Sequence, residues 1–372
     1  MLSRFLYVNA AGGPNEGHTD IYGFAVYTNG ELRVVPGSPA PAKDFGGGPI
    51  TISRDSKLLY STNFYEITAF QINADGSLTN APSPSFSIQD APVGLVAHPK
   101  ADFLYGSASS GVLSVFTIDS ATGALNLTSS VSLPGAANGS IEIVNSAVIT
   151  PNGRYLYQNE VQYEYYGQFP SEMQIAGFSI DSATGALNPV PGSPVSPSTP
   201  STIESSFSQM ATDPAGKFLY LSYQSAVVNV GLDGGVAAYS IDPTSGELSA
   251  APGSPFNVGG VPNSIAIDAS GKFLIASIGP RLGGAAGNCL AVLSIDSGTG
   301  ALTPVPGSPF GPSNCSGSVA ANPSGPFVYA GTVPSTVSVF SIDQATGALA
   351  PITQTAVPVS IQVSVSLIAL TH

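Results

Sequence analysis

The side chains best suited to binding a ligand are few, and several gather in one long connection between predicted strands. Tyr163, Tyr165 and Tyr166 lie within four consecutive residues of that connection. Exposed tyrosines offer a large apolar surface with a hydroxyl at its tip, which suits a sugar or a protein partner. The alternative is that these rings fold back and cover the edge of their own repeat unit.

Histidine and cysteine are too scarce to predict a metal site. The chain has three histidines and two cysteines. His18 has two carboxylates nearby in the sequence, but a solvated loop is the simpler interpretation. His98 falls in a turn position that Asp213 and Asp268 fill in other repeat units, so we expect it to be structural. No glycine-rich phosphate loop opens a helix either, and we expect neither a metal nor a cofactor.

The two cysteines, Cys289 and Cys315, are predicted to lie on the same side of one repeat unit. Their positions allow a disulfide, and buried free thiols are the alternative. A disulfide would indicate an oxidising compartment. The small number of charged residues also favours a periplasmic or extracellular location, with the cytoplasm as the alternative.

Charge and composition exclude several classes of protein. Ten Lys and Arg against 23 Asp and Glu give a net charge of −13, whereas a nucleic-acid-binding protein needs a basic stripe. The 42 glycines and 32 prolines argue against long helices. No continuous apolar run reaches the roughly 18–20 residues of a membrane-spanning helix. We therefore expect a turn-rich globular monomer that neither binds nucleic acid nor spans a membrane.

Two short motifs alternate along the chain and reveal an internal repeat. One is an aromatic-aliphatic triplet such as FLY, whose last residues are 45 to 63 positions apart. The other is a Gly-x-Leu turn such as TGAL, which follows each triplet, and both motifs occur seven times. The triplets end at Tyr7, Tyr60, Tyr105, Tyr157, Tyr220, Ile275 and Tyr329.

Each repeat unit is predicted to contain four short strands separated by turns. In the last complete unit they are Ser318–Ala321, Phe327–Ala330, Val337–Ile342 and a strand that begins at Ala348. Asp, Asn, Gly and Pro fill the connections, as hairpin turns require. Four-stranded units of about this length, repeated four to eight times, form β-propellers. The sequence therefore predicts an all-β, seven-bladed propeller.

The two ends of the chain are predicted to close the ring together. The chain starts in the second strand of its first unit, at Phe5–Val8, so that unit lacks an inner strand. Residues 363–370 have a strand-like pattern at the spacing of an inner strand. We expect this segment to complete blade one and to leave few open sheet edges. Residues 1–372 would then form a single domain.

Connection lengths predict which face of the propeller binds a ligand. From the triplet to the end of the third strand the separation is 13 or 14 residues in three units, but 21 to 24 in the other four. In an up-and-down blade this connection and the connection to the next blade emerge on the same face. Binding residues concentrate in variable connections on a rigid scaffold, so we expect the ligand on this face, around blade four.

The FLY strand, the SID-x-x-TGAL turn and the PGSP sequence (for example 191–194) resemble the YVTN-repeat and lactonase family of seven-bladed propellers. The resemblance spans the whole chain. That family includes 6-phosphogluconolactonases, which hydrolyse a sugar lactone, and propellers with no known activity. The Asn159-Glu160 pair, at the end of a triplet strand, is similar to a site of the catalytic branch. In that branch a His is expected at a position that falls near Val93 of this chain, and an Arg-His pair at positions that fall near Asn145 and Ser146. This chain has neither the His nor the pair at those places.

The resemblance implies roles for Glu160 and Arg281. Lactone hydrolysis needs a base to activate water and cationic or hydrogen-bonding groups for the developing oxyanion. Glu160 would be the base if burial raises its pKa, and Arg281 would hold a carboxylate or phosphate of the substrate. The alternatives are a hydrogen-bonded structural role for Glu160 and a solvated loop cation for Arg281.

Three functions follow from these observations. The first is an extracytoplasmic binding module that takes a small polar ligand or a protein through the long-loop face, with Asn159 and the three tyrosines as binding residues. The second is a hydrolase that opens a sugar-type lactone with Glu160 and Arg281. The third is a purely structural repeat at a cell surface.

Overall fold

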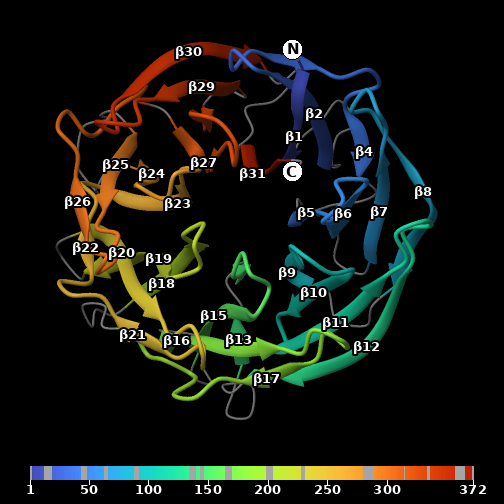
Figure 1. Cartoon of the computed structure of the whole chain (residues 1–372), viewed down its shortest axis with the longest axis horizontal. Coiled ribbons are helices and arrows are strands. Elements are labelled where there is room, and N and C mark those ends of the chain that lie inside the picture. The colour runs from blue at the N-terminus through green and yellow to red at the C-terminus, as the bar shows by residue number, and fades with distance from the viewer. Residues whose placement is uncertain are drawn as a thin grey trace.

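The computed structural model consists of β-strands around a central axis (Figure 1). The strands of the described residues form seven separate antiparallel sheets, so the predicted seven-bladed, all-β propeller is confirmed. The structure describes residues 2–11, 19–42, 48–62, 66–87, 92–133, 140–142, 146–163, 170–197, 204–227, 231–279, 289–313, 315–332, 336–356 and 365–370.

The blades are numbered along the chain, and their strands are given from the axis outward. Blade one contains β31 (Val365–Leu370), β1 (Leu2–Ala11), β2 (Thr19–Tyr27), β3 (Leu32–Val34) and β4 (Ala40–Ala42). Blade two contains β5 (Ile50–Ile52), β6 (Leu58–Thr62), β7 (Glu66–Ile72) and β8 (Leu78–Ser87). Blade three contains β9 (Pro92–Ala97), β10 (Phe103–Ala108), β11 (Val112–Ile118) and β12 (Leu125–Ser132).

The other four blades follow the same order. Blade four contains β13 (Ser140–Glu142) and β14 (Ala147–Ile149), both paired with β15 (Tyr155–Tyr163), then β16 (Pro170–Ile180) and β17 (Leu187–Pro189). Blade five contains β18 (Glu204–Thr212), β19 (Phe218–Val227), β20 (Gly231–Ile241), β21 (Leu248–Ala250) and β22 (Phe256–Asn257). Blade six contains β23 (Val261–Ile267), β24 (Phe273–Gly279), β25 (Leu290–Ile295) and β26 (Leu302–Pro304). Blade seven contains β27 (Cys315–Ala321), β28 (Phe327–Thr332), β29 (Thr336–Ile342) and β30 (Leu349–Ala356).

The ring closes through the C-terminal strand, as the sequence predicts. β31 pairs antiparallel with β1, with Ala369 opposite Tyr7 and Leu367 opposite Asn9. Figure 1 shows β31, in red, beside β1, in blue. The last strand of the chain therefore supplies the inner strand of the first blade, which ties the two ends of the chain into one sheet.

The two repeated motifs are the two halves of one contact between neighbouring blades, which we call the blade joint. In blades one to five, the tyrosine that ends the triplet donates its hydroxyl hydrogen to the carbonyl oxygen of the Gly-x-Leu glycine in the next blade. Five such bonds run from Tyr7 to Gly76, Tyr60 to Gly123, Tyr105 to Gly185, Tyr157 to Gly246 and Tyr220 to Gly300, at 2.7–3.3 Å. Because each motif needs its partner in the adjacent blade, both recur together.

Removing one hydroxyl from a blade joint should weaken the fold measurably. Tyr157 is fully buried and its hydroxyl lies 2.7 Å from the Gly246 carbonyl oxygen. Tyr157→Phe leaves that buried oxygen without this donor, so we expect the free energy of unfolding to fall by about 1–2 kcal/mol in denaturant titrations. An unchanged unfolding free energy would show that the bond contributes nothing net.

A serine-proline turn interrupts the outer strand in blades one, four, five and six. Ser38, Ser193, Ser254 and Ser308 each precede a cis proline, and each hydroxyl oxygen accepts a hydrogen bond from a third-strand amide at 2.9–3.1 Å. After the turn the chain returns to the same third strand, as β4 does to β2 and β22 to β20. These four blades are the ones with the long connection between second and third strands. In blades one, four and five the third strand has 9 to 11 residues, and in blade six the chain after the turn forms a bridge between Phe310 and Leu290 at the start of β25.

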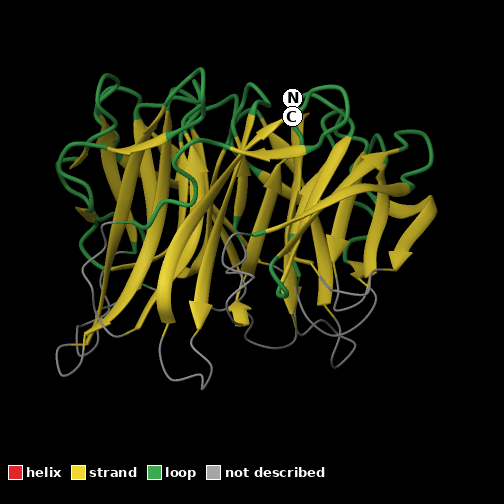
Figure 2. Ribbon diagram, turned by 90° about the horizontal axis from the view of Figure 1, so that it is seen from below, coloured by secondary structure: helices red, strands yellow, loops and turns green. Residues whose placement is uncertain are grey.

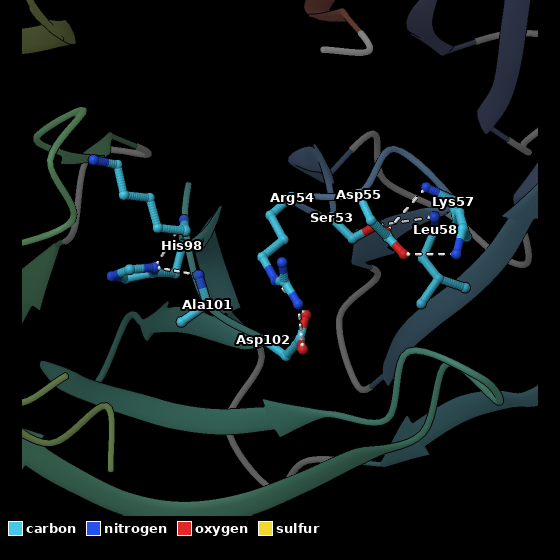
Figure 3. A network of polar contacts seen from close by, with 9 residues as sticks. Ser53, Arg54, Asp55, Lys57, Leu58, His98, Ala101 and Asp102 are labelled. Carbon is cyan, nitrogen blue, oxygen red and sulfur yellow. Dashed lines mark hydrogen bonds and ion pairs between the residues drawn. The ribbon is translucent and has the colours of Figure 1, made fainter. Parts of the chain in front are cut away.

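Figure 3 shows the turns that join first and second strands in blades two and three. Arg54 and Asp102 form a two-pronged ion pair across these turns, at 2.8 and 2.9 Å. His98 is buried and holds its own turn, because Nδ1 accepts hydrogen bonds from the amides of Lys100 and Ala101. Its Nε2 lies 2.9 Å from the Gly153 carbonyl oxygen in blade four. With Nδ1 accepting two bonds, the proton must reside on Nε2, so the neutral ring is the form that fits.

This arrangement predicts a loss of stability in mild acid. Burial, with a smaller contribution from Lys100, lowers the pKa of His98 from its ordinary value of 6.5. Below about pH 6.5 the unfolded chain takes up a proton that the folded chain resists. The contribution of neutral His98 to the unfolding free energy should therefore be fully present above that pH. Below it, the unfolding free energy should fall at up to about 1.4 kcal/mol per pH unit.

The matched variant is His98→Asn, because Asn322 fills the same turn position in blade seven. The Asn322 side-chain oxygen accepts a hydrogen bond from the Ser324 amide at 3.0 Å, without a group that titrates near neutrality. In this variant the slope of unfolding free energy between pH 5 and 6.5 should disappear. A slope of equal size in the variant and the parent would assign it to other groups.

Candidate functional site

The strands run between two opposite ends of the propeller (Figure 2). At one end lie the short turns from first to second strand and from third to fourth strand, which we call the tight-turn face. At the other end the second strand leads to the third, and the fourth leads to the next blade. We call this end the long-loop face, because the connections that vary in length in the sequence belong to it.

Three consecutive polar side chains are buried where β15 approaches the long-loop face. Gln158, Asn159 and Glu160 all have 0% exposure. The strand holds them by pairing with β16 on one side and with β13 and β14 on the other. Gln158 Nε2 donates to the Ser146 carbonyl oxygen at 3.1 Å and to the Asn159 carbonyl oxygen at 2.9 Å. The backbone N–H of Asn159 also donates to the Ser146 carbonyl oxygen, at 3.3 Å, which fixes the backbone of this run.

Two atoms of this run have capacity left for a ligand. Among the described residues, Gln158 Oε1 and Asn159 Nδ2 are buried without a hydrogen-bond partner. Together they present one acceptor and one donor. Buried polar atoms in folded proteins are almost always paired, with protein or with ordered water, so unpaired ones are places where water or a ligand would bind. Asn159 and Glu160 were candidates from the sequence, whereas Gln158 was not.

Asn159 belongs to a recurring set of buried polar side chains that we call the polar belt. Each member lies two residues beyond the end of a triplet, and each is at most 4% exposed. In blades one, three, five and six the pairing of the inner strand shifts register next to the belt residue. Such bulges often adjoin active sites, where they redirect side chains. The members are Asn9, Thr62, Ser107, Asn159, Ser222 and Ser277.

The polar belt was missed at the sequence level although its signal is present. A small polar residue stands at the same distance from the triplet in six of the seven units. In a single unit it looks like an ordinary strand residue, and only closure of the ring brings the six to one level.

The inner strands of blades four to seven are joined by polar side chains near the axis. Ser146 Oγ, Gln209 Oε1 and Ser264 Oγ each accept a hydrogen bond from a backbone amide of the next inner strand, at 2.8–3.1 Å. Gln209 Oε1 also accepts the hydroxyl hydrogen of Ser264 at 2.6 Å. This relay fixes the spacing of the inner strands that surround the blade-four site.

Several residues predicted for the site lie outside the described parts of the chain. Arg281, Tyr165 and Tyr166 are among them. Tyr163 ends β15, where its backbone pairs with Ser140, and its side chain is not described. Within the described ranges, no group of three or more His, Cys, Asp or Glu could hold a metal ion.

Cys289 is disulfide-bonded, and Cys315 is the only other cysteine of the chain. Cys289 is buried, and its amide donates to the Pro312 carbonyl oxygen at 3.0 Å. Cys315 opens β27, opposite Thr332. The bond therefore joins the end of the long connection in blade six to the inner strand of blade seven.

One family model matches part of the chain. The model of a family described as lactonase, seven-bladed β-propeller, matches residues 170–316. The resemblance to the lactonase family expected from the repeats is thus confirmed over that segment. No curated protein matches the sequence.

Solved structures extend the similarity of fold to the whole chain. A candidate 6-phosphogluconolactonase from Bacteroides uniformis has a TM-score of 0.70 at 16% identity and covers 100% of both chains. A second candidate 6-phosphogluconolactonase, from Bacteroides fragilis, has a TM-score of 0.68 at 20% identity and covers 99% of this chain and 97% of its own. The periplasmic gluconolactonase PpgL of Pseudomonas aeruginosa has a TM-score of 0.67 at 18% identity and covers 99% of each chain. At these identities the likeness shows the fold.

Among the described residues, no helix is long and apolar enough to cross a membrane.

Proposed function

We propose that this propeller binds a small polar ligand of the sugar-lactone class at the blade-four end of its long-loop face. The observation that carries the proposal is the buried run Gln158–Asn159–Glu160, with two amide atoms that no described residue pairs. A buried polar group without a partner costs free energy. A polyhydroxylated ligand supplies both the donor and the acceptor that these two atoms need.

Hydrolysis of the bound lactone is the second candidate function, and the complete burial of Glu160 favours it. The Glu160 carboxylate would take a proton from water as the water oxygen bonds to the lactone carbonyl carbon. Asn159 Nδ2 could donate to the oxyanion that forms. The ring carbon–oxygen bond then breaks, the leaving oxygen takes the proton, and a hydroxy acid results. Arg281 remains a predicted anchor for a charged group of the substrate.

Burial and chemistry at Glu160 can be separated by one substitution. In Glu160→Gln the side chain keeps its shape but cannot act as a base. If Glu160 is the base, hydrolysis of sugar lactones above the spontaneous rate should fall by roughly 10²–10⁴ while ligand binding persists. Turnover is followed by acid release and binding by calorimetry, on a panel of sugar lactones.

The control is Glu247→Gln, which changes an exposed carboxylate on the tight-turn face and should alter neither quantity. Binding without turnover in the parent would support the binding function and refute hydrolysis. Absence of both from folded protein would refute the proposal and return attention to a protein partner for Tyr163, Tyr165 and Tyr166.

We also propose an extracytoplasmic location for the chain, as one domain over residues 1–372. The disulfide-bonded state of Cys289 supports an oxidising compartment, because disulfides are rare in reducing cytosol. The periplasmic location in the name of the Pseudomonas aeruginosa neighbour is compatible with it. Fractionation of the source cells would test it, and recovery of the chain in the cytosolic fraction with two free thiols would refute it.

A further inference from the structure

Positive charge is segregated to one end of the propeller. Eight of the ten Lys and Arg residues are described, and all eight lie toward the tight-turn face. Arg4 stands near the start of β1 and Arg33 near the start of β3, which are the strand ends at that face. The other six lie in turns from first to second strand and are Arg54, Lys57, Lys100, Arg154, Lys217 and Lys272.

Most of the described Asp and Glu residues lie, like the cations, toward the tight-turn face, but several stand at the long-loop face, which has no described Lys or Arg. Asp20, Glu66, Glu172 and Asp233 stand at or near the starts of third strands, at this end. Glu160 on β15, Glu142 on β13 and Glu204 on β18 lie at the same end by their strand pairing. Among the described residues, the strand positions at this face therefore include seven Asp or Glu and no Lys or Arg.

The rest of the chain cannot reverse this sign. The residues outside the described ranges contain Lys43 and Arg281 against Glu16, Asp44, Asp90 and Glu164. Like charges at low effective dielectric repel by kilocalories per mole at close range. An anionic ligand that approaches the long-loop face therefore meets a repulsive field, whereas an uncharged ligand does not.

A second observation shows where an uncharged ligand would find partners. In blades two to four, the belt atoms Thr62 Oγ1, Ser107 Oγ and Asn159 Nδ2 are buried and unpaired among the described residues. In blades five and six the equivalent hydroxyls are paired: Ser222 Oγ donates to the Gln209 carbonyl oxygen at 3.1 Å, and Ser277 Oγ donates to the Gly317 carbonyl oxygen. Among the belt members of blades two to six, spare hydrogen-bonding capacity is thus found in blades two to four.

Glycines let the backbone beside that arc pass close to two of its hydroxyls. A Cβ atom added to Gly48 would collide with Thr62 Oγ1, and one added to Gly94 would collide with Ser107 Oγ. The two hydroxyls therefore occupy space that a side chain at Gly48, just before β5, or at Gly94, on β9, would need. Hydroxyl and amide groups are neutral, and they match the alternating donors and acceptors of a polyol.

We propose that the ligand site extends along the belt from blade two to blade four, and that it selects an uncharged polyhydroxylated ligand over its phosphorylated or carboxylate form. This inference rests on the proposed function, because both place a sugar-type ligand at the long-loop face. It adds the extent of the site and the charge of the ligand. A phosphate group would bring two negative charges to a face without a described cation.

The test compares a hexonolactone, its 6-phosphate and the open hexonate by calorimetry with the folded parent protein. We expect the lactone to bind at least tenfold more tightly than either anion at 10 mM ionic strength. The difference should shrink in 0.5 M salt, because screening weakens repulsion between exposed charges. Equal or tighter binding of the phosphate would overturn the charge selection, and the loss of that binding in Arg281→Gln would identify the cation responsible.

Two serine variants test the extent of the site. Ser107→Ala removes an unpaired hydroxyl, so lactone affinity should fall about fivefold to tenfold while the unfolding temperature stays the same or rises. Ser222→Ala removes a paired hydroxyl of the same belt, so stability should fall while affinity stays unchanged. An unchanged affinity in Ser107→Ala would overturn the blade-two to blade-four site while leaving the Glu160 region intact. Failure of all three ligands to bind the folded parent would refute the proposed function and this inference with it.

Discussion

Gly347→Ala should lower the free energy of unfolding by roughly 3–4 kcal/mol. Gly347 belongs to the Gly-x-Leu turn of blade seven and has a φ of +76°, which an alanine adopts only at a cost. An added Cβ would also stand 2.6 Å from the ring of Phe273 and 3.1 Å from Val305, both buried in blade six. Overpacking of a buried contact typically costs about 1–3 kcal/mol beyond the backbone effect. The joint between these blades has Ile275 in place of the tyrosine, so packing carries it alone.

Gly37→Ala is the matched control for the backbone effect. Gly37 has a φ of +70°, but an added Cβ would meet nothing within 4 Å. We expect this variant to lose only about 1–2 kcal/mol in the same denaturant titration. Equal losses in the two variants would show that the blade joint tolerates the methyl group, and that close packing over the glycine is not required.

The architecture was predictable because each repeated motif performs the same physical task in most blades. The Gly-x-Leu glycine must combine a positive φ with close approach of buried side chains from the preceding blade, as at Gly185, where an added Cβ would stand 2.8 Å from the Phe103 ring. Only glycine meets both conditions, so the residue recurs and the repeat can be read directly. Ring closure was equally readable, since the missing inner strand of blade one left one apolar segment at the right spacing.

The site was less predictable because its parts come from different repeat units. The resemblance drew attention to Asn159 and Glu160, whereas nothing distinguished Gln158, Thr62 or Ser107 from ordinary polar strand residues. Their significance depends on which side chains find partners after the ring has closed, and that is a property of contacts between strands. The interrupted outer strands were missed for a similar reason. The PGSP sequence was recognised as a motif. Predicting that the chain then pairs again with the third strand requires knowing how far that strand extends.

Loss of the disulfide should be the other large effect, because Cys289 and Cys315 enclose a loop of about 26 residues. Cross-linking a loop of that length restricts the unfolded chain and stabilises the fold by roughly 3–4 kcal/mol in the loop-entropy model. The native backbone already holds this region without the bond. Leu290 and Phe310 exchange hydrogen bonds at 3.0 and 2.7 Å, and the Cys289 amide reaches Pro312. Most of the stabilisation should therefore arise in the unfolded state, and the folded ring should survive reduction.

The measurement is thermal unfolding of the parent and of the double variant Cys289→Ala/Cys315→Ala, each with and without a reductant. The parent should lose roughly 4–5 °C in unfolding temperature on reduction, given the entropy of unfolding expected for a chain of this length. The double variant should unfold at about the temperature of the reduced parent and show no response to the reductant. A parent whose unfolding temperature does not change, although its two thiols become titratable, would show that backbone pairing around Leu290 alone secures this part of the long-loop face. Collapse of the reduced ring would instead mean that the bond is needed to join blades six and seven.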